Sequence, residues 1–430
     1  MKRKFISYPI TDFSLFKTQL LNFSKRFGNF CFLDNQKYDF DRSYECIAGV
    51  GISKCLTAGK RNNLLSLNNF IKENRDWIFG HASYDIKNEI ENLFSKNADG
   101  IEFPDYRFFV PEFVFILSKD TVEIGMSSNA DSKKIFEEII NIIIPEEINF
   151  PKPQILSRFS KDEYLEVVKK LQKHILRGDC YEMCFCQEFF SENVQIDPVK
   201  VFKKLSDLSP NPFSAFYRSG EKYLMCASPE RFLKKTKNVI ISQPIKGTSR
   251  RTANTFENEA EKNLLFVDEK ERAENIMIVD LVRNDLSKIC TEGSVYVKEF
   301  LKVYSFPQVH QMISTITGKL RENISFAEIL SATFPMGSMT GAPKKRAMEL
   351  IEEYEKTKRG LFSGTVGYMN PDGDFDFNVV IRSILYNEKN KYLSIQAGSA
   401  ITWKSIPQKE YDECNIKIEA MKMALGDILE

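Results

Sequence analysis

The 430-residue sequence lacks a hydrophobic run long enough to cross a membrane and carries almost no net charge. No run approaches the roughly 18 apolar residues of a membrane helix. The formal net charge is +1, from 60 basic and 59 acidic residues, so no overall field attracts nucleic acid or an anionic membrane surface. The start, Met1-Lys2-Arg3-Lys4, is basic, but Pro9 and Asp12 interrupt it before a signal-peptide hydrophobic region forms. We therefore predict a cytoplasmic protein that binds neither nucleic acid nor membrane.

The cysteines form neither a disulfide framework nor a zinc-ligand set. Nine is an odd number, and the cysteines are scattered along a chain with a large apolar fraction, which favours reduced thiols. Cys180, Cys184 and Cys186 cluster in the strand-like run 180–190, but no second cysteine or histidine cluster completes a zinc site. No cysteine stands in a Gly-x-Cys-x-Gly motif, so we expect no glutaminase nucleophile in this chain.

The chain is long enough, at 43% hydrophobic residues, to bury a large core. The proline-rich stretch 145–153 suggests a boundary, which divides the chain into an N-terminal α/β region, 1–150, and a second region, 156–427. Ser160 and Glu163 form a capping box before a helix with one apolar face. Further helices are predicted at 133–144, 257–286, 343–354 and 408–425.

Lys246 stands in the pentapeptide Pro-Ile-Lys-Gly-Thr, residues 244–248. The proline fixes the backbone before the lysine, and Gly247 lets another group approach closely. A lysine amine acts as a nucleophile when its pKa falls from about 10.4 towards neutrality, for example beside other cations. The alternative is a solvated lysine in a loop after the strand 239–241. Candidate neighbouring cations are Lys234, Lys235, Lys237, Arg250 and Arg251.

Two of the predicted helices carry acidic residues on one face. Glu271 and Glu274 are three residues apart, and Glu410, Glu413 and Lys417 follow at spacings of three and four, so each set shares one helical face. Two such faces, if they meet, would suit Mg²⁺, which takes oxygen ligands and keeps water or substrate oxygens in its remaining positions. Ordinary surface charge has the same spacing, and both interpretations stay open.

Two segments rich in small residues are candidate anion sites. Residues 334–344 run from a glycine-rich loop into a helix that Pro343 can begin, and free amides at a helix start attract anions. The segment lacks the Gly-Lys-Ser/Thr ending of a nucleotide P-loop, so a carboxylate is the better candidate ligand. Arg382 and the run 397–400 would bind another carboxylate. The alternatives are a simple helix cap and a tight sheet turn.

Six ordered motifs lie between residues 156 and 425. They are Ala-Ser-Pro-Glu-Arg-Phe at 227–232, the pentapeptide at 244–248, Arg-Ala-Glu-Asn at 272–275 leading into 279–286, Gly-Ala-Pro-Lys at 341–344, and the segments 359–368 and 410–417. Together they resemble the motifs of the chorismate-utilising enzyme family. The resemblance implies an α/β (α+β) fold like that of anthranilate synthase, a sandwich of two packed β-sheets flanked by helices, with the active site between the sheets.

The resemblance also implies a reaction. Family members that make anthranilate usually have alanine at the position of Lys246, so lysine indicates amination of chorismate at ring carbon 4, giving 4-amino-4-deoxychorismate for 4-aminobenzoate and folate synthesis. Lys246 would form a covalent intermediate, and Glu230 would be the general acid. Substrate contacts implied by the motifs are Gly247, Thr248, His310, Ser338, Arg382, Gly398, Ser399 and Lys417.

A metal and a partner are implied as well. Glu274 and Glu413 would bind Mg²⁺, and Glu271 and Glu410 would orient its water ligands. Because the chain has no glutaminase motif, a separate amidotransferase chain would supply ammonia from glutamine.

The sequence departs from the family pattern at three positions. Ala400 replaces the second glycine of a Gly-x-Gly, and Phe362 replaces a tyrosine common in relatives. Glu182 stands where isochorismate and salicylate synthases carry a water-activating lysine, which argues against those reactions. Two alternatives remain: an anthranilate-forming enzyme, and a non-catalytic scaffold that binds chorismate or an amidotransferase.

Overall fold

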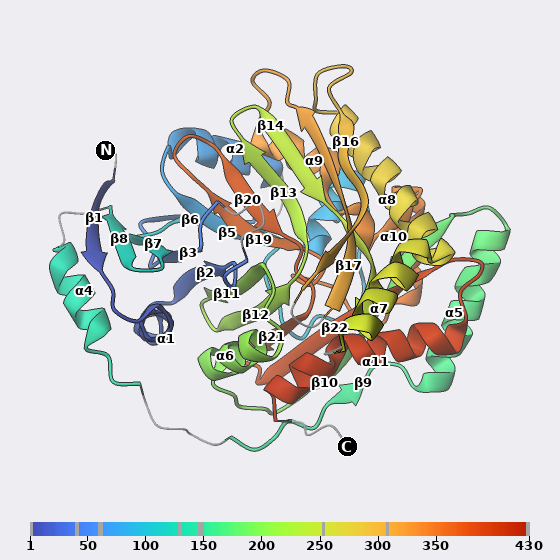
Figure 1. The fold of residues 1–430 in the computed structure, drawn as a ribbon, viewed down its shortest axis with the longest axis horizontal. Coiled ribbons are helices and arrows are strands. Elements are labelled where there is room, and N and C mark those ends of the chain that lie inside the picture. Colours follow the sequence, from blue (N-terminus) through green and yellow to red (C-terminus); the bar gives the residue numbers. More distant parts are fainter. Residues whose placement is uncertain are drawn as a thin grey trace.

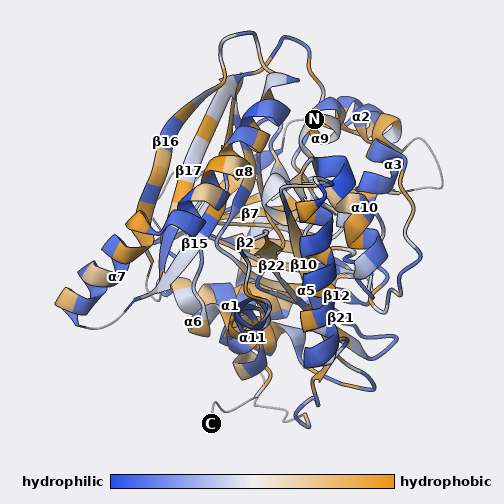
Figure 2. Ribbon diagram, turned by 90° about the vertical axis from the view of Figure 1, so that its right-hand side faces the viewer, coloured by the Kyte–Doolittle hydropathy of each residue, from blue (hydrophilic) through white to orange (hydrophobic). Residues whose placement is uncertain are grey.

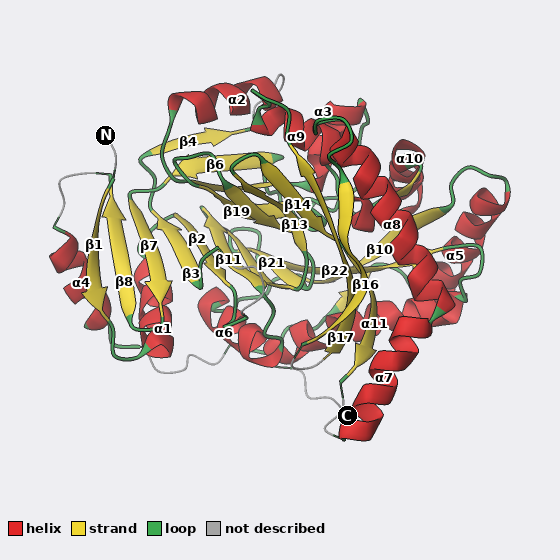
Figure 3. Ribbon diagram, turned by 45° about the horizontal axis from the view of Figure 1, so that its top comes forward, coloured by secondary structure: helices red, strands yellow, loops and turns green. Residues whose placement is uncertain are grey.

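The computed structural model describes residues 3–38, 43–58, 63–127, 131–144, 150–251, 254–306 and 309–426. Two large β-sheets form the centre of the molecule and helices lie around them (Figures 1 and 3). The predicted sandwich of two sheets flanked by helices is therefore confirmed. The predicted boundary between residues 150 and 156 stays a prediction, and residues 145–149 of the proline-rich stretch lie outside the described residues.

The larger sheet has the strand order β1-β8-β7-β3-β2-β11-β12-β21-β22-β10-β18, with β9 beside β10. Its strands are β1 (Lys4–Pro9), β2 (Asn29–Asp34), β3 (Cys46–Val50), β7 (Phe113–Ser118), β8 (Thr121–Met126), β9 (Leu156–Ser157), β10 (Glu182–Ser191), β11 (Phe213–Ser219), β12 (Lys222–Ser228), β18 (Gly341–Ala342), β21 (Ser383–Asn387) and β22 (Tyr392–Ile401).

The smaller sheet has the order β15-β17-β14-β13-β20-β19-β5-β6-β4, with β16 beside β17. Its strands are β4 (Lys54–Thr57), β5 (Ile78–Ala82), β6 (Tyr106–Val110), β13 (Arg231–Thr236), β14 (Val239–Gln243), β15 (Ile245–Arg250), β16 (Tyr296–Ser305), β17 (Val309–Lys319), β19 (Thr365–Met369) and β20 (Phe375–Asn378).

Both sheets combine strands from the two halves of the sequence. In the larger sheet β2 pairs antiparallel with β11, and in the smaller one β5 pairs antiparallel with β19. Strands before residue 150 and strands after residue 156 therefore complete the same two layers, so the two regions share one fold.

Alternation along the strands produces two hydrophobic cores. On β2, Phe30 and Phe32 belong to one core and Cys31 to the other, as the two-residue period of a strand requires. The core that contains Cys31 also holds Phe79 and Phe109 of the smaller sheet, so it lies between the sheets. The other core lies between the larger sheet and its covering helices. Figure 2 shows these helices with both hydrophilic and hydrophobic residues, as expected of helices that cover a sheet.

The helices largely follow the sequence pattern. The capping box of Ser160 and Glu163 begins α5, as predicted. The predicted helix 257–286 is instead two helices, because the Asp268 side chain accepts a hydrogen bond from the Glu271 backbone and starts a new helix. The helices are α1 (Phe13–Ser24), α2 (Asn63–Glu73), α3 (Lys87–Glu91), α4 (Ser132–Ile140), α5 (Lys161–Leu176), α6 (Pro198–Leu208), α7 (Thr255–Val267), α8 (Glu269–Ser287), α9 (Phe326–Thr333), α10 (Lys344–Tyr354) and α11 (Pro407–Ala424), with short 3₁₀ turns η1 (Tyr84–Ile86) and η2 (Gly337–Met339).

The sequence analysis also made predictions about membrane-spanning helices and about the cysteines. Within the described residues, every helix is too short or too polar to pass through a lipid bilayer. All nine cysteines lie in the described part of the chain and are free, as predicted.

A buried ion pair holds the η2 segment against β10. Arg359 donates to both carboxylate oxygens of Glu355, at 2.6 and 2.9 Å, and to the backbone carbonyls of Met339 in η2 and Cys184 in β10. Glu355 in turn accepts a hydrogen bond from the Cys186 backbone. One guanidinium–carboxylate pair therefore fixes the segment that carries Ser338 beside strand β10.

We expect Arg359→Met to lower the free energy of unfolding by about 3–5 kcal/mol, because it leaves the Glu355 carboxylate buried and unpaired. Arg346→Met is the matched control, since its ion pair with Glu349 is exposed and should contribute less than about 1 kcal/mol. Denaturant unfolding measures both. A loss in Arg359→Met no larger than in the control would contradict this role.

Candidate active site

Lys246 lies in strand β15 and not in a loop. The strand pairs antiparallel with β17, with a bulge between Ile245 and Thr248. Its side chain is only 12% exposed, and its Nζ donates to Glu182 Oε1 at 3.0 Å and lies 3.9 Å from Glu274 Oε2. The interpretation of Lys246 as a solvated loop lysine is therefore wrong.

The charges around Lys246 are opposite to those predicted. Burial lowers the pKa of Lys246, but the nearby carboxylates of Glu182 and Glu274 outweigh it, so that its pKa is raised above the ordinary value. Two of the predicted cationic neighbours have their contacts elsewhere: Lys235 binds Asp374 and the Gly373 carbonyl, and Arg251 donates to the Phe306 carbonyl. In this state Lys246 is an ammonium group, and it must lose a proton before it can act as a nucleophile.

Glu182 is better placed than Glu274 to accept a proton from Lys246, because its Oε1 lies 3.0 Å from Nζ and Glu274 Oε2 lies 3.9 Å from it. It lies in the buried run of β10, and the cost of burying its charge raises its pKa, although Lys246 opposes this. Sequence reasoning used Glu182 only to exclude other reactions. The available signal was an acidic residue at the start of a strand-like run that is mostly apolar up to Cys186, because a buried carboxylate requires a partner.

Glu230 forms a second acidic group with Ser338. Ser338 Oγ donates to Glu230 Oε1 at 2.7 Å, and both side chains line a small cavity that also includes Pro244 of the pentapeptide. Burial raises the pKa of Glu230 to about 7, whereas the Ser338 hydrogen bond and the Lys246 charge act to lower it. A carboxyl group with such a pKa carries a proton in a good fraction of molecules near neutrality, as a general acid requires.

The two predicted acidic helical faces do meet. Lys270 of α8 reaches across to α11, where its Nζ lies 3.1 Å from Glu410 Oε1, and it also lies 3.7 Å from Glu274 Oε1 on its own helix. Burial raises the pKa of Glu274 to about 7, with Glu182 also raising it and Lys246 and Lys270 lowering it. Burial likewise raises the pKa of Glu271 to about 7, and the charge of Glu274 adds to the effect.

Glu413 and Lys417 form the outer end of this cluster. Lys417 Nζ lies 2.5 Å from Glu413 Oε1 and donates to the Gly398 carbonyl at 2.8 Å. Arg382 donates to the Lys417 carbonyl. These contacts bring Arg382, Gly398 and Lys417 together with the predicted metal ligand Glu413.

Gly247 and Gly398 are needed for close packing. Gly247 has a φ of +87°, and a Cβ on it would lie 3.2 Å from the Glu271 side chain, so glycine lets α8 approach the strand that carries Lys246. A Cβ on Gly398 would lie 2.4 Å from Cys186 Sγ. Ser399 is buried and lies 3.3 Å from the Tyr164 hydroxyl.

His310 lies on β17, the strand that pairs with the Lys246 strand β15. It pairs with Ser249 in the strand register, and its two ring nitrogens hydrogen-bond to Ser305 and Asn258. Thr248 is exposed on β15. The substrate contacts predicted for His310 and Thr248 stay predictions.

The chemistry of the carboxylate cluster fits a hard divalent cation. Buried oxygens of Glu182, Glu274 and Glu410 have no hydrogen-bond partner, and carboxylate oxygens are the donors that Mg²⁺ prefers. Yet among the described residues no three acidic, histidine or cysteine side chains converge closely enough to hold a metal ion. The oxygens are present, but lysine side chains lie between them.

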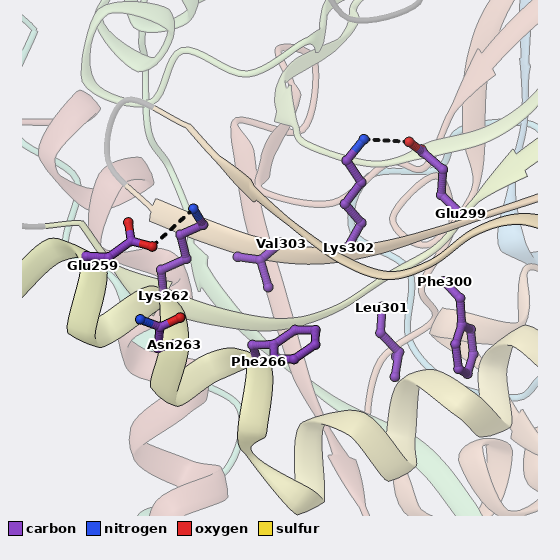
Figure 4. Close-up of a pocket in the computed structure, with 9 residues that line it drawn as sticks. All are labelled: Glu259, Lys262, Asn263, Phe266, Glu299, Phe300, Leu301, Lys302 and Val303. Carbon is purple, nitrogen blue, oxygen red and sulfur yellow. Dashed lines mark hydrogen bonds and ion pairs between the residues drawn. The ribbon is translucent and has the colours of Figure 1, made fainter.

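A surface pocket between α7 and β16 is separate from this cluster (Figure 4). Two ion pairs lie in its wall, Lys262 with Glu259 at 3.5 Å and Lys302 with Glu299 at 2.6 Å. The full lining is Glu259, Lys262, Asn263, Phe266, Glu299, Phe300, Leu301, Lys302 and Val303. The predicted catalytic residues Lys246 and Glu230 are not in this lining.

A model of the chorismate binding enzyme family matches residues 29–423. The chain is 31% identical to aminodeoxychorismate synthase component 1 of Bacillus subtilis, over 80% of this chain and 76% of that protein. It is 30% identical to anthranilate synthase component 1 of Aquifex aeolicus, over 81% and 74%. It is 40% identical to a probable chloroplastic aminodeoxychorismate synthase of Oryza sativa over 63% of this chain, but the match covers only 30% of that longer protein. The crystal structure of anthranilate synthase component I from Streptococcus pneumoniae superposes with a TM-score of 0.77 at 26% identity, covering 92% of each chain.

We expect Lys246→Ala to destabilise the fold in a pH-dependent way. The variant leaves Glu182 buried without its partner, which costs about 3–5 kcal/mol when the carboxylate is charged. Burial raises the folded-state pKa of Glu182, and removal of Lys246 raises it further. The protonated form is therefore tolerated at pH 5, and the destabilisation should shrink as the pH falls.

Urea unfolding at pH 5 and pH 8 measures the effect. Lys302→Ala, which breaks the exposed pair with Glu299, is the control. A loss in Lys246→Ala that is the same at both pH values would show that Glu182 does not depend on Lys246.

Proposed function

We propose, because the chain belongs to the chorismate binding enzyme family, that it converts chorismate and ammonia to 4-amino-4-deoxychorismate, the precursor of 4-aminobenzoate. The observation that carries the proposal is Lys246, a largely buried amine whose ammonium group contacts Glu182. Enzymes that form anthranilate usually have alanine at this position, and alanine offers no nucleophile. The name of the Bacillus subtilis relative, aminodeoxychorismate synthase component 1, agrees with this choice.

The contacts suggest a role for each acidic neighbour of Lys246. Glu182 accepts a proton from the Lys246 ammonium, and the free amine adds to carbon 2 of chorismate. The bond from carbon 4 to its hydroxyl breaks as Glu230 donates a proton, so the hydroxyl leaves as water. Ammonia then attacks carbon 4, and Lys246 departs as an amine. Glu182 would thus accept a proton and Glu230 would donate one.

Glu274 and Glu413 would hold Mg²⁺, with Glu271 and Glu410 orienting its water ligands. The ion would bind a carboxylate of the substrate and polarise it. Glu274 and Glu410 each have a buried oxygen that accepts no hydrogen bond, which supports this assignment.

Ammonia would come from a separate amidotransferase chain. The sequence carries no cysteine in a glutaminase motif, and the relatives are named as component 1 of their enzymes. The predicted cytoplasmic location stays a prediction.

The direct test is chromatography of the products formed from chorismate, ammonium and Mg²⁺ by the isolated chain. We expect 4-amino-4-deoxychorismate, which an added lyase converts to 4-aminobenzoate. Glutamine should not replace ammonium until an amidotransferase is added. Anthranilate as the main product would contradict the proposal, and chorismate binding without turnover would favour the scaffold alternative.

The raised pKa of Glu230 predicts the pH dependence of this reaction. The general acid must be protonated, and its protonated fraction falls tenfold for each pH unit above its pKa of about 7. The rate, normalised to unprotonated ammonia, should therefore fall above about pH 7. Ser338→Ala removes a hydrogen bond that lowers this pKa, so its alkaline limb should move to higher pH.

Ser287→Ala is the control, because Ser287 is the last residue of α8 and its hydroxyl donates to the Asn284 carbonyl of the same helix. Its pH profile should match that of the wild type. An alkaline limb that stays in place in Ser338→Ala would mean that another group supplies the proton.

A further inference from the structure

Lys270 occupies a position between the predicted metal ligands. Its Nζ bridges two helices, at 3.1 Å from Glu410 Oε1 on α11 and 3.7 Å from Glu274 Oε1 on α8. The lysine side chain is 39% exposed, whereas those of Glu274 and Glu410 are only 7% and 2% exposed. The ammonium group therefore enters from the solvent side and covers two buried carboxylates.

The cluster is short of positive charge even with Lys270 in place. Lys246, Lys270 and Lys417 pair with the carboxylates of Glu182, Glu274, Glu410 and Glu413. Arg382 lies beside Glu413 and Glu271 beside Glu274, so four basic side chains face five carboxyl groups. One oxygen on each of Glu182, Glu274 and Glu410 is buried without a hydrogen-bond partner. Buried carboxylate oxygens that accept no hydrogen bond are costly, and the Lys270 ammonium lies 3.7 Å from Glu274 Oε1 without a hydrogen bond to it. These oxygens therefore point to a cation of higher charge than an ammonium.

We propose that Lys270 is a tethered cation that fills the carboxylate site in the metal-free protein, and that a divalent cation must displace it. The proposal rests on the proposed function only through its magnesium site. It accounts for the lack of a converged metal-binding group among the described side chains, because the lysine holds Glu274 and Glu410 in ion pairs. Displacement exchanges one positive charge for two, which suits a cluster with excess carboxylates. Metal affinity is then reduced by the fraction of molecules in which Lys270 fills the site.

The first test is a titration with Mn²⁺, followed by electron paramagnetic resonance, of the wild type, Lys270→Met and Lys262→Met. Lys262 is a matched control: its side chain is 37% exposed, and it pairs with Glu259 in the surface pocket of Figure 4. Without its competitor, the site in Lys270→Met should bind Mn²⁺ at least about fivefold more tightly. The metal-free variant should also melt at a lower temperature than the wild type, and Mn²⁺ should restore more of its stability.

The second test uses the wild-type protein, so it does not depend on the folding of a variant. Acetylation of lysines with an N-hydroxysuccinimide ester, followed by peptide mass spectrometry, reports the exposure of each amine. Mg²⁺ should increase the labelling of Lys270 and leave that of Lys262 unchanged. This readout separates displacement from a general electrostatic effect of removing one positive charge.

Unchanged or weaker Mn²⁺ binding in Lys270→Met, or labelling of Lys270 that does not respond to Mg²⁺, would overturn the proposal. The proposed function would survive these results if the wild type still makes 4-amino-4-deoxychorismate. Conversely, formation of anthranilate together with tighter Mn²⁺ binding by Lys270→Met would refute the proposed function and support the tethered cation.

Discussion

The burial of several carboxyl groups in one cluster is the constraint on which the rest of the site depends. Glu182, Glu274 and Glu410 are each under 10% exposed, and the cost of burying the charges raises the pKa values of Glu182 and Glu274. Lysine side chains are drawn in to balance them. The same attraction raises the pKa of Lys246 and favours its ammonium form, so the nucleophilic role proposed for Lys246 requires that a proton leave first.

Strand β10 is the element that connects this cluster to the scaffold. It carries Glu182, the partner of Lys246. Through the Cys184 carbonyl and the Cys186 amide it also binds the buried pair of Arg359 and Glu355, which fixes the turn that holds Ser338. On its other side, β22 packs so closely that Gly398 has no room for a Cβ beside Cys186. Parts of the site that are far apart in sequence are therefore positioned by one strand.

The sequence allowed prediction of features that depend on local spacing. The capping box of Ser160, the shared helical faces of the glutamates and the strand containing Glu182 all follow from residue periodicity. The two-sheet architecture came from the family resemblance and not from periodicity. Long-range contacts could not be predicted in this way: Lys246 and Glu182 are 64 residues apart in sequence. The contact of Lys270 with Glu274 could have been predicted from their spacing of four residues on one helix. Its contact with Glu410 could not, because it depends on how α8 and α11 pack.

The central claim is that Lys246 is a nucleophile that bonds covalently to the substrate. Intact-protein and peptide mass spectrometry of the chain incubated with chorismate and Mg²⁺, without ammonia, tests it most directly. Replacement of the carbon 4 hydroxyl predicts an adduct with the mass of chorismate less one water, located on the peptide that contains Lys246 and absent from Lys246→Ala. Formation of 4-amino-4-deoxychorismate by Lys246→Ala at the wild-type rate, with no adduct on the wild-type protein, would contradict the account.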